Sequence, residues 1–321
     1  MHFSISKNET IVILGASGFI GKHLVSALVK EGGFKIRVLT RNIRRDYFEK
    51  KFSQYVEVFE GDPGSLDSLR AVFIPECTVI NLVYLQKTSE ESNLDYIQNL
   101  LAACDETNVA RLIHCSTADV VGRVSTNIAN ELTECQPTTE YGITKLKIEQ
   151  AIINYSSDKF DKVILRPTAV LGPEGESLKK LAKDLSNGRS WRNYLKSCLF
   201  GRRRMNLVPV ANVVAAFIFI SGQVKRLGGE IYIVSNDDDP RNNFIDVENF
   251  LIGALGVDEY RLPRLTIPLA VLKFLLMMLG KNNVNPRCNF DSSKLSKLGF
   301  TSQVSLFEGM AEFVAWYRSS Q

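Results

Sequence analysis

The sequence contains few residues of the kinds that hold metal ions or cross-link secreted proteins. Three histidines and six cysteines are scattered over 321 residues, and no two cysteines are spaced as Cys-x-x-Cys. We therefore expect no metal site, no disulfide framework and reduced thiols, as in cytoplasmic proteins. The amino-terminal residues also lack the charged start and long apolar centre of a signal peptide.

The sequence also lacks a strong excess of either charge. It has 39 basic and 35 acidic residues, for a formal net charge of +4. This balance argues against a nucleic-acid-binding protein, which concentrates basic residues on one surface. With 45% hydrophobic residues and a mean hydropathy of −0.03, the chain resembles an ordinary globular protein. Its length favours one large α/β domain with a smaller second lobe.

Long uninterrupted apolar runs are missing as well. Two apolar stretches, 208–220 and 262–279, are too short or too interrupted for a membrane span of about 20 residues. We expect the second to form a buried or interface helix without membrane contact. Nearby cations leave attachment to a membrane surface as the alternative. These cations are Arg261, Arg264, Lys273 and Lys281.

The most informative feature present is a β-branched apolar run, 10–14, that ends in three regularly spaced glycines. Gly15 allows a tight turn, Gly18 allows close approach of a pyrophosphate, and Gly21 allows the next helix to pack on the strand. The helix amino terminus would then hold the phosphates. The pattern predicts a dinucleotide site, and an ordinary strand-to-helix turn is the alternative. The other expected cofactor contacts in this turn are Ser17, Phe19 and Ile20.

Strands and helices alternate along the first part of the chain. Residues 23–30 have helical periodicity, and 35–39 follow as a second strand, which completes a βαβ unit. The alternation predicts a doubly wound parallel (Rossmann) sheet that binds ligands at the carboxyl ends of its strands. Further expected strands are 56–59, 78–83, 111–115, 162–165 and 231–234, and further expected helices are 93–107 and 139–155.

The alternation ends after Pro173, where a charged and polar stretch begins. We therefore expect a dinucleotide-binding domain formed by 1–172 and 205–235. A smaller carboxyl-terminal α/β substrate lobe would contain 173–204 and 236–321.

The end of the second strand favours NADP as the cofactor and leaves NAD as the alternative. In dinucleotide folds a carboxylate at this point holds the ribose of NAD, whereas an arginine accommodates the 2′-phosphate of NADP. Here Arg41 follows the strand, and Arg44 and Arg45 come soon after. Asp62, after the third strand, is a candidate acceptor for the adenine amine, or a plain turn residue.

Two residues on the helix 139–155 predict acid–base chemistry. Tyr141 and Lys145 are four residues apart and share one helix face. A lysine ammonium beside a phenol stabilises the phenolate and lowers the tyrosine pKa, which prepares a proton donor and acceptor for a hydroxyl or carbonyl.

With these motifs, the chain resembles the extended short-chain dehydrogenase/reductases, specifically the NAD(P)-dependent sugar-nucleotide epimerase/dehydratase family. The resemblance covers nearly the whole length and implies that Thr117, Tyr141 and Lys145 are catalytic. Tyr141 and Lys145 would also contact the cofactor, together with Pro167. The matching segments are 15–21, Asn93 with 99–101, Thr117 with Gly122, 141–145, 165–173, 291–300, 305–306 and 316–317.

The resemblance implies hydride transfer between a nicotinamide and a sugar carbon, as in a 4-epimerase or a close ketoreductase of surface polysaccharide synthesis. Ser116 could replace Thr117, although neighbouring strand residues point in opposite directions. Dehydratases of the family carry an Asp-Glu pair where this chain has Ala118 and Asp119, which disfavours dehydration. Val121 and Asn212 also depart from the family pattern.

A nucleotide-sugar substrate needs cations for its diphosphate, and Arg204 and Arg287 are the candidates. The alternative functions are an NADPH-dependent reductase of an apolar or lipid-linked carbonyl compound, and a catalytically silent nucleotide-binding protein. The family further implies a homodimer formed through the helices 93–107 and 139–155.

Overall fold

The computed structural model describes residues 9–41, 52, 54–278 and 285–321. The chain divides into two compact units. Unit 1 contains 1–117, 143–166 and 214–232, and unit 2 contains 118–142, 167–213 and 233–321. This division differs from the expected one because two segments pair inside unit 2. Strand β9 (Leu207–Pro209) pairs with β8 (Ala169–Leu171), and β6 (Ile128–Ala129) pairs with β11 (Asn289–Phe290).

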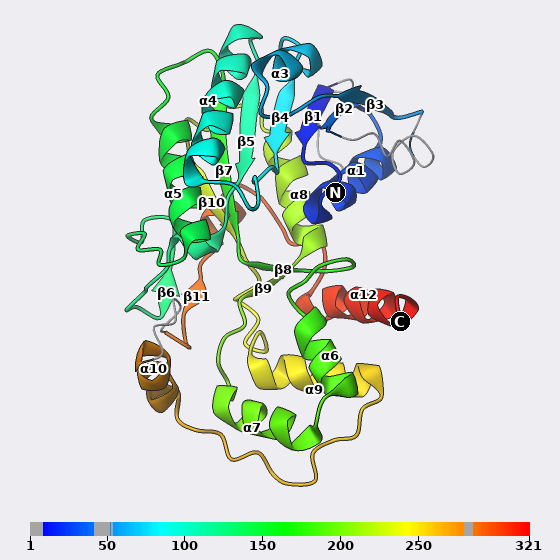
Figure 1. Ribbon diagram of the computed structural model, residues 1–321, viewed down its shortest axis with the longest axis vertical. Coiled ribbons are helices and arrows are strands. Elements are labelled where there is room, and N and C mark those ends of the chain that lie inside the picture. The colour runs from blue at the N-terminus through cyan, green and yellow to red at the C-terminus, as the bar shows by residue number, and fades with distance from the viewer. Residues whose placement is uncertain (1–8, 42–51, 53, 279–284) are drawn as a thin grey trace. The chain divides into compact units, whose positions relative to one another are not determined.

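Unit 1 is organised around a seven-stranded sheet with the order β10-β7-β5-β4-β1-β2-β3 (Figure 1). The pairs from β7 to β3 are parallel. The strand order reverses between β1 and β4, the place where doubly wound sheets bind ligands. The strands are β1 (Glu9–Leu14), β2 (Phe34–Thr40), β3 (Val56–Glu60), β4 (Thr78–Asn81), β5 (Arg111–Cys115), β7 (Asp161–Pro167) and β10 (Ile231–Val234).

Helices α3, α4 and α5 pack on one face of this sheet and build a core with it. Val12 of β1, Leu100 of α4 and Ile148 of α5 belong to one buried cluster. Serine side chains cap α3 and α4, so α4 begins three residues earlier than its apolar pattern predicts. The helices of unit 1 are α1 (Phe19–Glu31), α3 (Leu66–Val72), α4 (Glu90–Glu106), most of α5 (Glu140–Ile153) and most of α8 (Val210–Ser221).

Two buried ion pairs hold strands β5 and β7 to neighbouring elements. Arg166 of β7 donates to Glu149 of α5, with an Nη2–Oε2 distance of 2.6 Å. Arg111 donates to Asp161 at 2.8 Å and also to backbone carbonyl groups after α8. Removing one partner of such a pair leaves an uncompensated buried charge. The first pair therefore holds α5 on the sheet, and the second holds the segment after α8 against β5 and β7.

Unit 2 contains two short parallel strand pairs and a separate helical core. Leu171, Leu185, Leu251 and Phe313 belong to that core. The apolar stretch 208–220 forms the end of β9 and most of α8, and residue 279 of the other expected stretch lies outside the described residues. Within the described part of the chain, no helix is long and apolar enough to cross a membrane. The helices are α6 (Lys179–Asn187), α7 (Ser190–Phe200), α9 (Phe244–Leu255), α10 (Leu269–Met278), α11 (Ser293–Lys297) and α12 (Leu306–Ser319).

Candidate active site

The turn between β1 and α1 has no room for side chains at two of its glycines. Gly15 has a φ of +85°, and a Cβ atom there would lie 3.1 Å from the carbonyl carbon of Leu82. A Cβ atom on Gly21 would overlap the carbonyl oxygen of Gly15 and lie 2.6 Å from Cα of Ala16. Both glycines are therefore required by close backbone packing, as the spacing predicts.

The amino terminus of α1 is suited to an anion. Among the described residues no side chain caps this helix at Gly18, and its first turn contains no acidic residue. Within the same described ranges the amino termini of α6, α7 and α11 likewise have no side-chain cap, whereas α3, α4, α9 and α12 each receive one. The first N–H groups of a helix have no intrahelical partner and carry a partial positive charge. The α1 turn, in which Ser17 and Gly18 are exposed, can therefore donate to a phosphate.

The neighbouring strand β4 ends in a buried polar network centred on Asn81. Its amide Nδ2 lies 3.1 Å from Nδ1 of His114, and its Oδ1 accepts hydrogen bonds from Tyr96 Oη and Val83 N at 2.7 and 3.0 Å. Burial and the nearby Lys145 charge hold the pKa of His114 well below its usual value, so the imidazole is neutral. The network fixes the backbone that follows β4 against Gly15.

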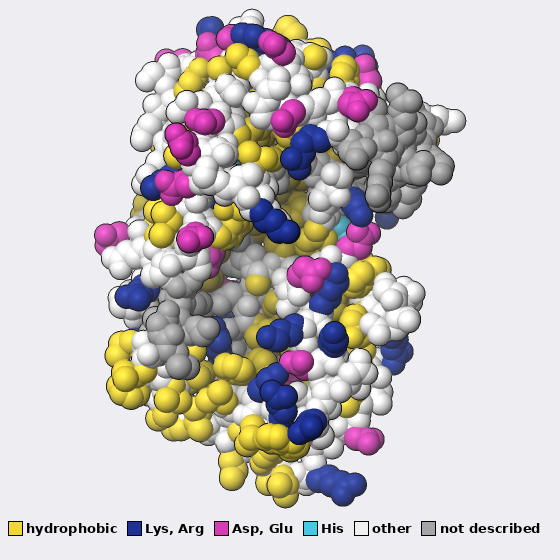
Figure 2. Space-filling view, in the orientation of Figure 1, with side chains coloured by type: hydrophobic (Ala, Val, Ile, Leu, Met, Phe, Trp, Pro, Cys, Tyr) yellow, Lys and Arg dark blue, Asp and Glu magenta, His cyan; other side chains and the backbone are white. Residues whose placement is uncertain are grey.

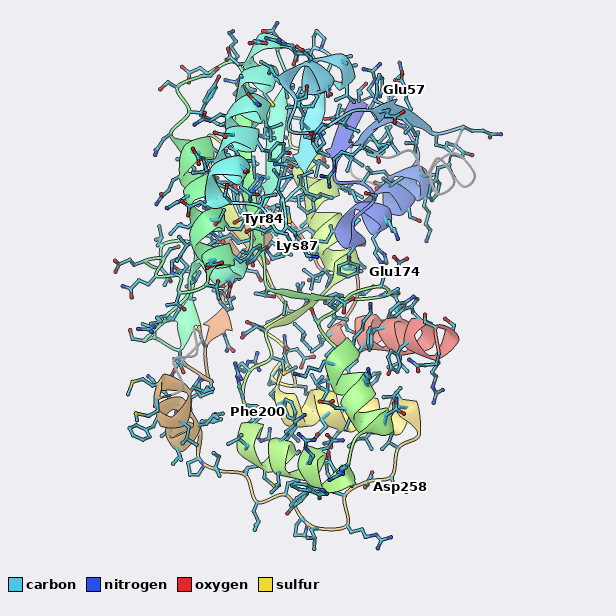
Figure 3. The ribbon with its side chains drawn as sticks, in the orientation of Figure 1. Glu57, Tyr84, Lys87, Glu174, Phe200 and Asp258 are labelled. Carbon is cyan, nitrogen blue, oxygen red and sulfur yellow. The ribbon has the colours of Figure 1, made fainter. Side chains whose placement is uncertain are left out.

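Lys145 is a buried cation beside the end of β5. Its Nζ donates to the carbonyl oxygen of Cys115 at 2.7 Å and lies 5.5 Å from the ring centroid of Tyr84. Figure 3 labels Tyr84 on the segment that follows β4. Burial lowers the pKa of Lys145, and the charge of Glu149 opposes that shift. The side chain is only 3% exposed, so its ammonium is held in one place.

The two hydroxyl candidates after β5 differ in their surroundings. Ser116 is buried, and its Oγ has no hydrogen-bond partner among the described residues. Thr117 is partly exposed. It lies two residues after Cys115, whose carbonyl oxygen accepts the hydrogen bond from Lys145. Thr117 is thus the more exposed of the two residues, and contact of either hydroxyl group with a ligand stays a prediction.

The start of α5 is fixed by a chain of hydrogen bonds within unit 2. Thr139 Oγ1 donates to Asp119 at 2.8 Å and accepts from the N–H of Gly142 at 2.9 Å. Tyr141 lies in this first turn and is 39% exposed. Because α5 continues into unit 1 without a break, Lys145 follows Tyr141 after one helical turn.

The remaining expected cofactor contacts lie at strand ends. Arg41 is exposed directly after β2, whereas Arg44 and Arg45 lie outside the described residues. Asp62 forms a turn after β3, in which its Oδ1 accepts from Gly64 N at 3.0 Å. Pro167 is the last residue of β7 and is buried. The turn explains Asp62 without a ligand, and its contact with adenine stays a prediction.

The two arginines expected to hold a diphosphate are placed differently. Arg204 donates through both terminal nitrogens to the carbonyl oxygens of Asp237, Asp239 and Pro240, so its guanidinium group braces that loop. Arg287 is exposed. Arg204 therefore has a structural role that its sequence position did not reveal, and diphosphate binding by either residue stays a prediction.

Comparison with known families identifies the chain. The sequence model of the NAD dependent epimerase/dehydratase family matches residues 11–235, about two thirds of the protein. The chain belongs to this family. It is thus a member of a family of NAD-dependent enzymes, and the resemblance inferred from its motifs is confirmed.

Curated relatives include enzymes with different substrates. Short-chain dehydrogenase/reductase family 42E member 1 of Xenopus laevis is 24% identical, with coverage of 90% of this chain and 79% of the relative. Sterol-4-alpha-carboxylate 3-dehydrogenase of Mus musculus is 25% identical, with 86% and 76% coverage. The dTDP-glucose 4,6-dehydratase of Actinoplanes is 24% identical, with 97% and 98% coverage.

Solved structures share the fold over the full length. The dTDP-glucose 4,6-dehydratase of Bacillus anthracis in complex with NAD has a TM-score of 0.75 at 14% identity, with 98% of this chain and 97% of that chain covered. UDP-glucuronic acid 4-epimerase of Bacillus cereus in complex with NAD has a TM-score of 0.73 at 20% identity, with 97% and 99% coverage. These similarities confirm the doubly wound parallel fold.

Several residues of this site were not predicted from the sequence. Asn81 and Tyr84 come from the end of β4, and Asp119 and Thr139 hold the start of α5. A usable signal existed for the first two, because the carboxyl ends of neighbouring parallel strands meet at one edge of the sheet. The pairing of Asp119 with Thr139 spans 20 residues and has no local signature.

Proposed function

We propose that the protein transfers a hydride between a nicotinamide cofactor and a hydroxyl-bearing carbon of a nucleotide sugar, as a 4-epimerase or a close ketoreductase. The observation that supports this best is the placement of Lys145. Its ammonium is buried at the end of β5, one helical turn from the exposed phenol of Tyr141. Few structural roles require a buried cation beside a partly exposed tyrosine.

The residues present fit a dinucleotide. Gly15 and Gly21 leave no room for side chains at their positions in the turn, and the uncapped start of α1 offers N–H donors for a pyrophosphate. When bound, the cofactor supplies or accepts the hydride. Phe19, Ile20, Lys145 and Pro167 are the further residues that we expect to hold it.

The side chains of this protein would manage the proton. Tyr141 Oη takes the proton of the substrate hydroxyl group when that carbon is oxidised and returns it when the ketone is reduced. The Lys145 ammonium stabilises the phenolate form, which lowers the tyrosine pKa. The Thr117 hydroxyl group donates a hydrogen bond to the same substrate oxygen and so fixes its direction.

Dehydration is a poor fit to this site. The position that supplies an acid in related dehydratases carries Ala118, which has no ionisable group. Asp119 accepts a hydrogen bond from Thr139 and so helps to fix the start of α5. Loss of water from a sugar needs both a proton donor and a proton acceptor beside the reacting carbons, and these two positions do not supply such a pair.

The substrate class can be tested with a panel of UDP-, GDP- and dTDP-sugars, each with NAD, NADH, NADP or NADPH. If the protein is an epimerase, we expect it to convert at least one nucleotide sugar to its 4-epimer without net change of cofactor. If it is a ketoreductase, we expect it to reduce a 4-keto nucleotide sugar to the 4-alcohol with consumption of reduced cofactor. Chromatography of the products and cofactor absorbance distinguish these reactions. If no nucleotide sugar in the panel reacts, the proposal is contradicted.

A second candidate, a dehydrogenase or reductase of an apolar carbonyl compound, is favoured by the sterol-converting relative at 25% identity. A 3-hydroxysterol and its 3-ketone in the same panel test it. Turnover of these compounds alone would assign the enzyme to that class, and it would leave the role of Tyr141 unchanged.

We further propose that Arg41 gives the enzyme a preference for NADP. The family is NAD-dependent and the similar structures contain NAD, so this preference depends on the arginine alone. Arg41→Ala should weaken NADP binding roughly tenfold or more, the worth of a hydrogen bond between charged groups, and leave NAD binding unchanged. Calorimetric titration measures both affinities. Lys35→Ala serves as the control, because it removes an exposed cation from β2, the strand that Arg41 follows. If the ratio of the NADP affinity to the NAD affinity is unchanged in Arg41→Ala, the assignment is rejected.

A further inference from the structure

We propose that unit 2 docks on the surface of an anionic lipid bilayer through α10 and the segment that precedes it. Only Leu272 and Leu276 of α10 are buried, and they form one narrow stripe toward the protein. Leu269 is half-buried, and the remaining residues of the helix are exposed although all except Lys273 are apolar; Figure 2 shows apolar side chains as a group over α10. We call the exposed set the α10 surface: Leu262, Leu265, Val271, Phe274, Leu275, Met277 and Met278, which are 40–77% exposed.

Helix α7 extends this surface. The N–H of Ile267 donates to the carbonyl oxygen of Cys198 at 3.2 Å, and Tyr194 Oη donates to the carbonyl oxygen of Pro263 at 2.9 Å. The segment before α10 is therefore held on α7. Two large apolar side chains of α7, Trp191 and Leu195, are also more than half exposed. An apolar area shared by several elements marks an interaction site on a folded protein.

The same elements carry more basic than acidic residues. Residues 187–205 contain six basic residues and no acidic one, whereas residues 258–278 contain three basic residues and two exposed acidic ones, Asp258 and Glu259, which line one pocket with Trp191 and Arg261. Arg189, Arg192, Arg261 and Lys273 are exposed, whereas Arg264 is mostly covered and pairs with Glu248 at 3.5 Å. Exposed cations around an apolar face complement the negative surface of an anionic membrane.

The length and composition of α10 favour the surface of a bilayer as the occupant. The ten residues of α10 span about 15 Å, half of the hydrocarbon thickness of about 30 Å, so the helix can lie in the interface but cannot cross it. Lys273 is the one charged residue of α10, and Trp191 of α7 and Phe274 of α10 are residue types found on the apolar face of helices that lie on a membrane.

The test is flotation of the complete protein with vesicles of phosphatidylcholine alone and of equal parts phosphatidylcholine and phosphatidylglycerol. We expect binding to the mixed vesicles that weakens as salt is added, and little binding to the neutral ones. Phe274→Asp should reduce binding at least about tenfold, because it replaces a membrane-buried aromatic group by an anion. Val224→Asp is the matched control: Val224 is 95% exposed and lies in unit 1, and its variant should bind like the wild type.

Tryptophan fluorescence supplies an independent reading. Trp191 is 58% exposed, so its emission should shift to shorter wavelength on the mixed vesicles, and Trp191→Phe should abolish the shift. Circular dichroism establishes that each variant is folded. Absence of binding to both kinds of vesicle, or equal binding by Phe274→Asp, would overturn the proposal. A concentration-dependent dimer that Phe274→Asp disrupts, without vesicle binding, would overturn it in favour of a second copy of the chain.

Discussion

Replacing Tyr141 by phenylalanine is expected to lower kcat by about 10²- to 10⁴-fold, the contribution of a well-placed general acid or base. Affinity for the nicotinamide cofactor should change little, because the variant keeps the aromatic ring and the first turn of α5. Steady-state kinetics on the substrate found in the panel measures the first quantity, and calorimetric titration with the cofactor measures the second.

The control for this variant is Tyr155→Phe. Tyr155 follows the last turn of the same helix and packs beside Phe160, so the substitution removes a hydroxyl group without touching the start of α5. We expect wild-type kcat from it. If Tyr141→Phe retained full activity, the phenol could not carry the proton, and the proposed mechanism would be lost.

Gly21→Ala is expected to destabilise the fold by about 1–3 kcal/mol, the usual effect of forcing a methyl group into a packed interior. The added carbon would meet the backbone of Gly15 and Ala16, which cannot move aside as a flexible side chain can. Because the same turn is the expected pyrophosphate site, cofactor affinity should fall as well. Chemical denaturation and cofactor titration measure the two effects.

Gly253→Ala is the matched control for that substitution. Gly253 also lies in a helix, α9, but a Cβ atom there would meet no other atom within 4 Å. Alanine is about 1 kcal/mol more favourable than glycine in a helix, so this variant should be as stable as the wild type or more stable. A Gly21→Ala protein with wild-type stability and cofactor affinity would show that the turn is not packed as described.

Local patterns predicted much of unit 1. The strands at 111–115 and 231–234 begin and end where expected. Residues 231–234, Ile-Tyr-Ile-Val, form the short apolar run with sharp ends that is typical of a buried strand. The glycine spacing was also sufficient to predict the tight turn between β1 and α1. Apart from Leu82, the backbone atoms that exclude side chains at these glycines are close in sequence. Tyr141 and Lys145 could be paired because helical periodicity alone brings them to one face.

Contacts between distant residues could not be predicted in this way. The bracing of the 237–240 loop by Arg204 depends on carbonyl groups more than 30 residues away. Residues 118–142 belong to unit 2 through pairing of β6 with β11, which lies about half the chain away. The Asn81 network likewise requires three elements to meet in the core. Such contacts depend on tertiary packing, which leaves no periodic signal in the sequence.

The most direct test of the enzymatic account is a crystal structure of the protein with NADP or NAD bound. The account predicts the pyrophosphate on the N–H groups at the start of α1, and the nicotinamide ribose within hydrogen-bond reach of Lys145 Nζ, with Tyr141 Oη beside the nicotinamide ring. A cofactor bound elsewhere, or a Tyr141 side chain that faces bulk solvent with the cofactor in place, would contradict it.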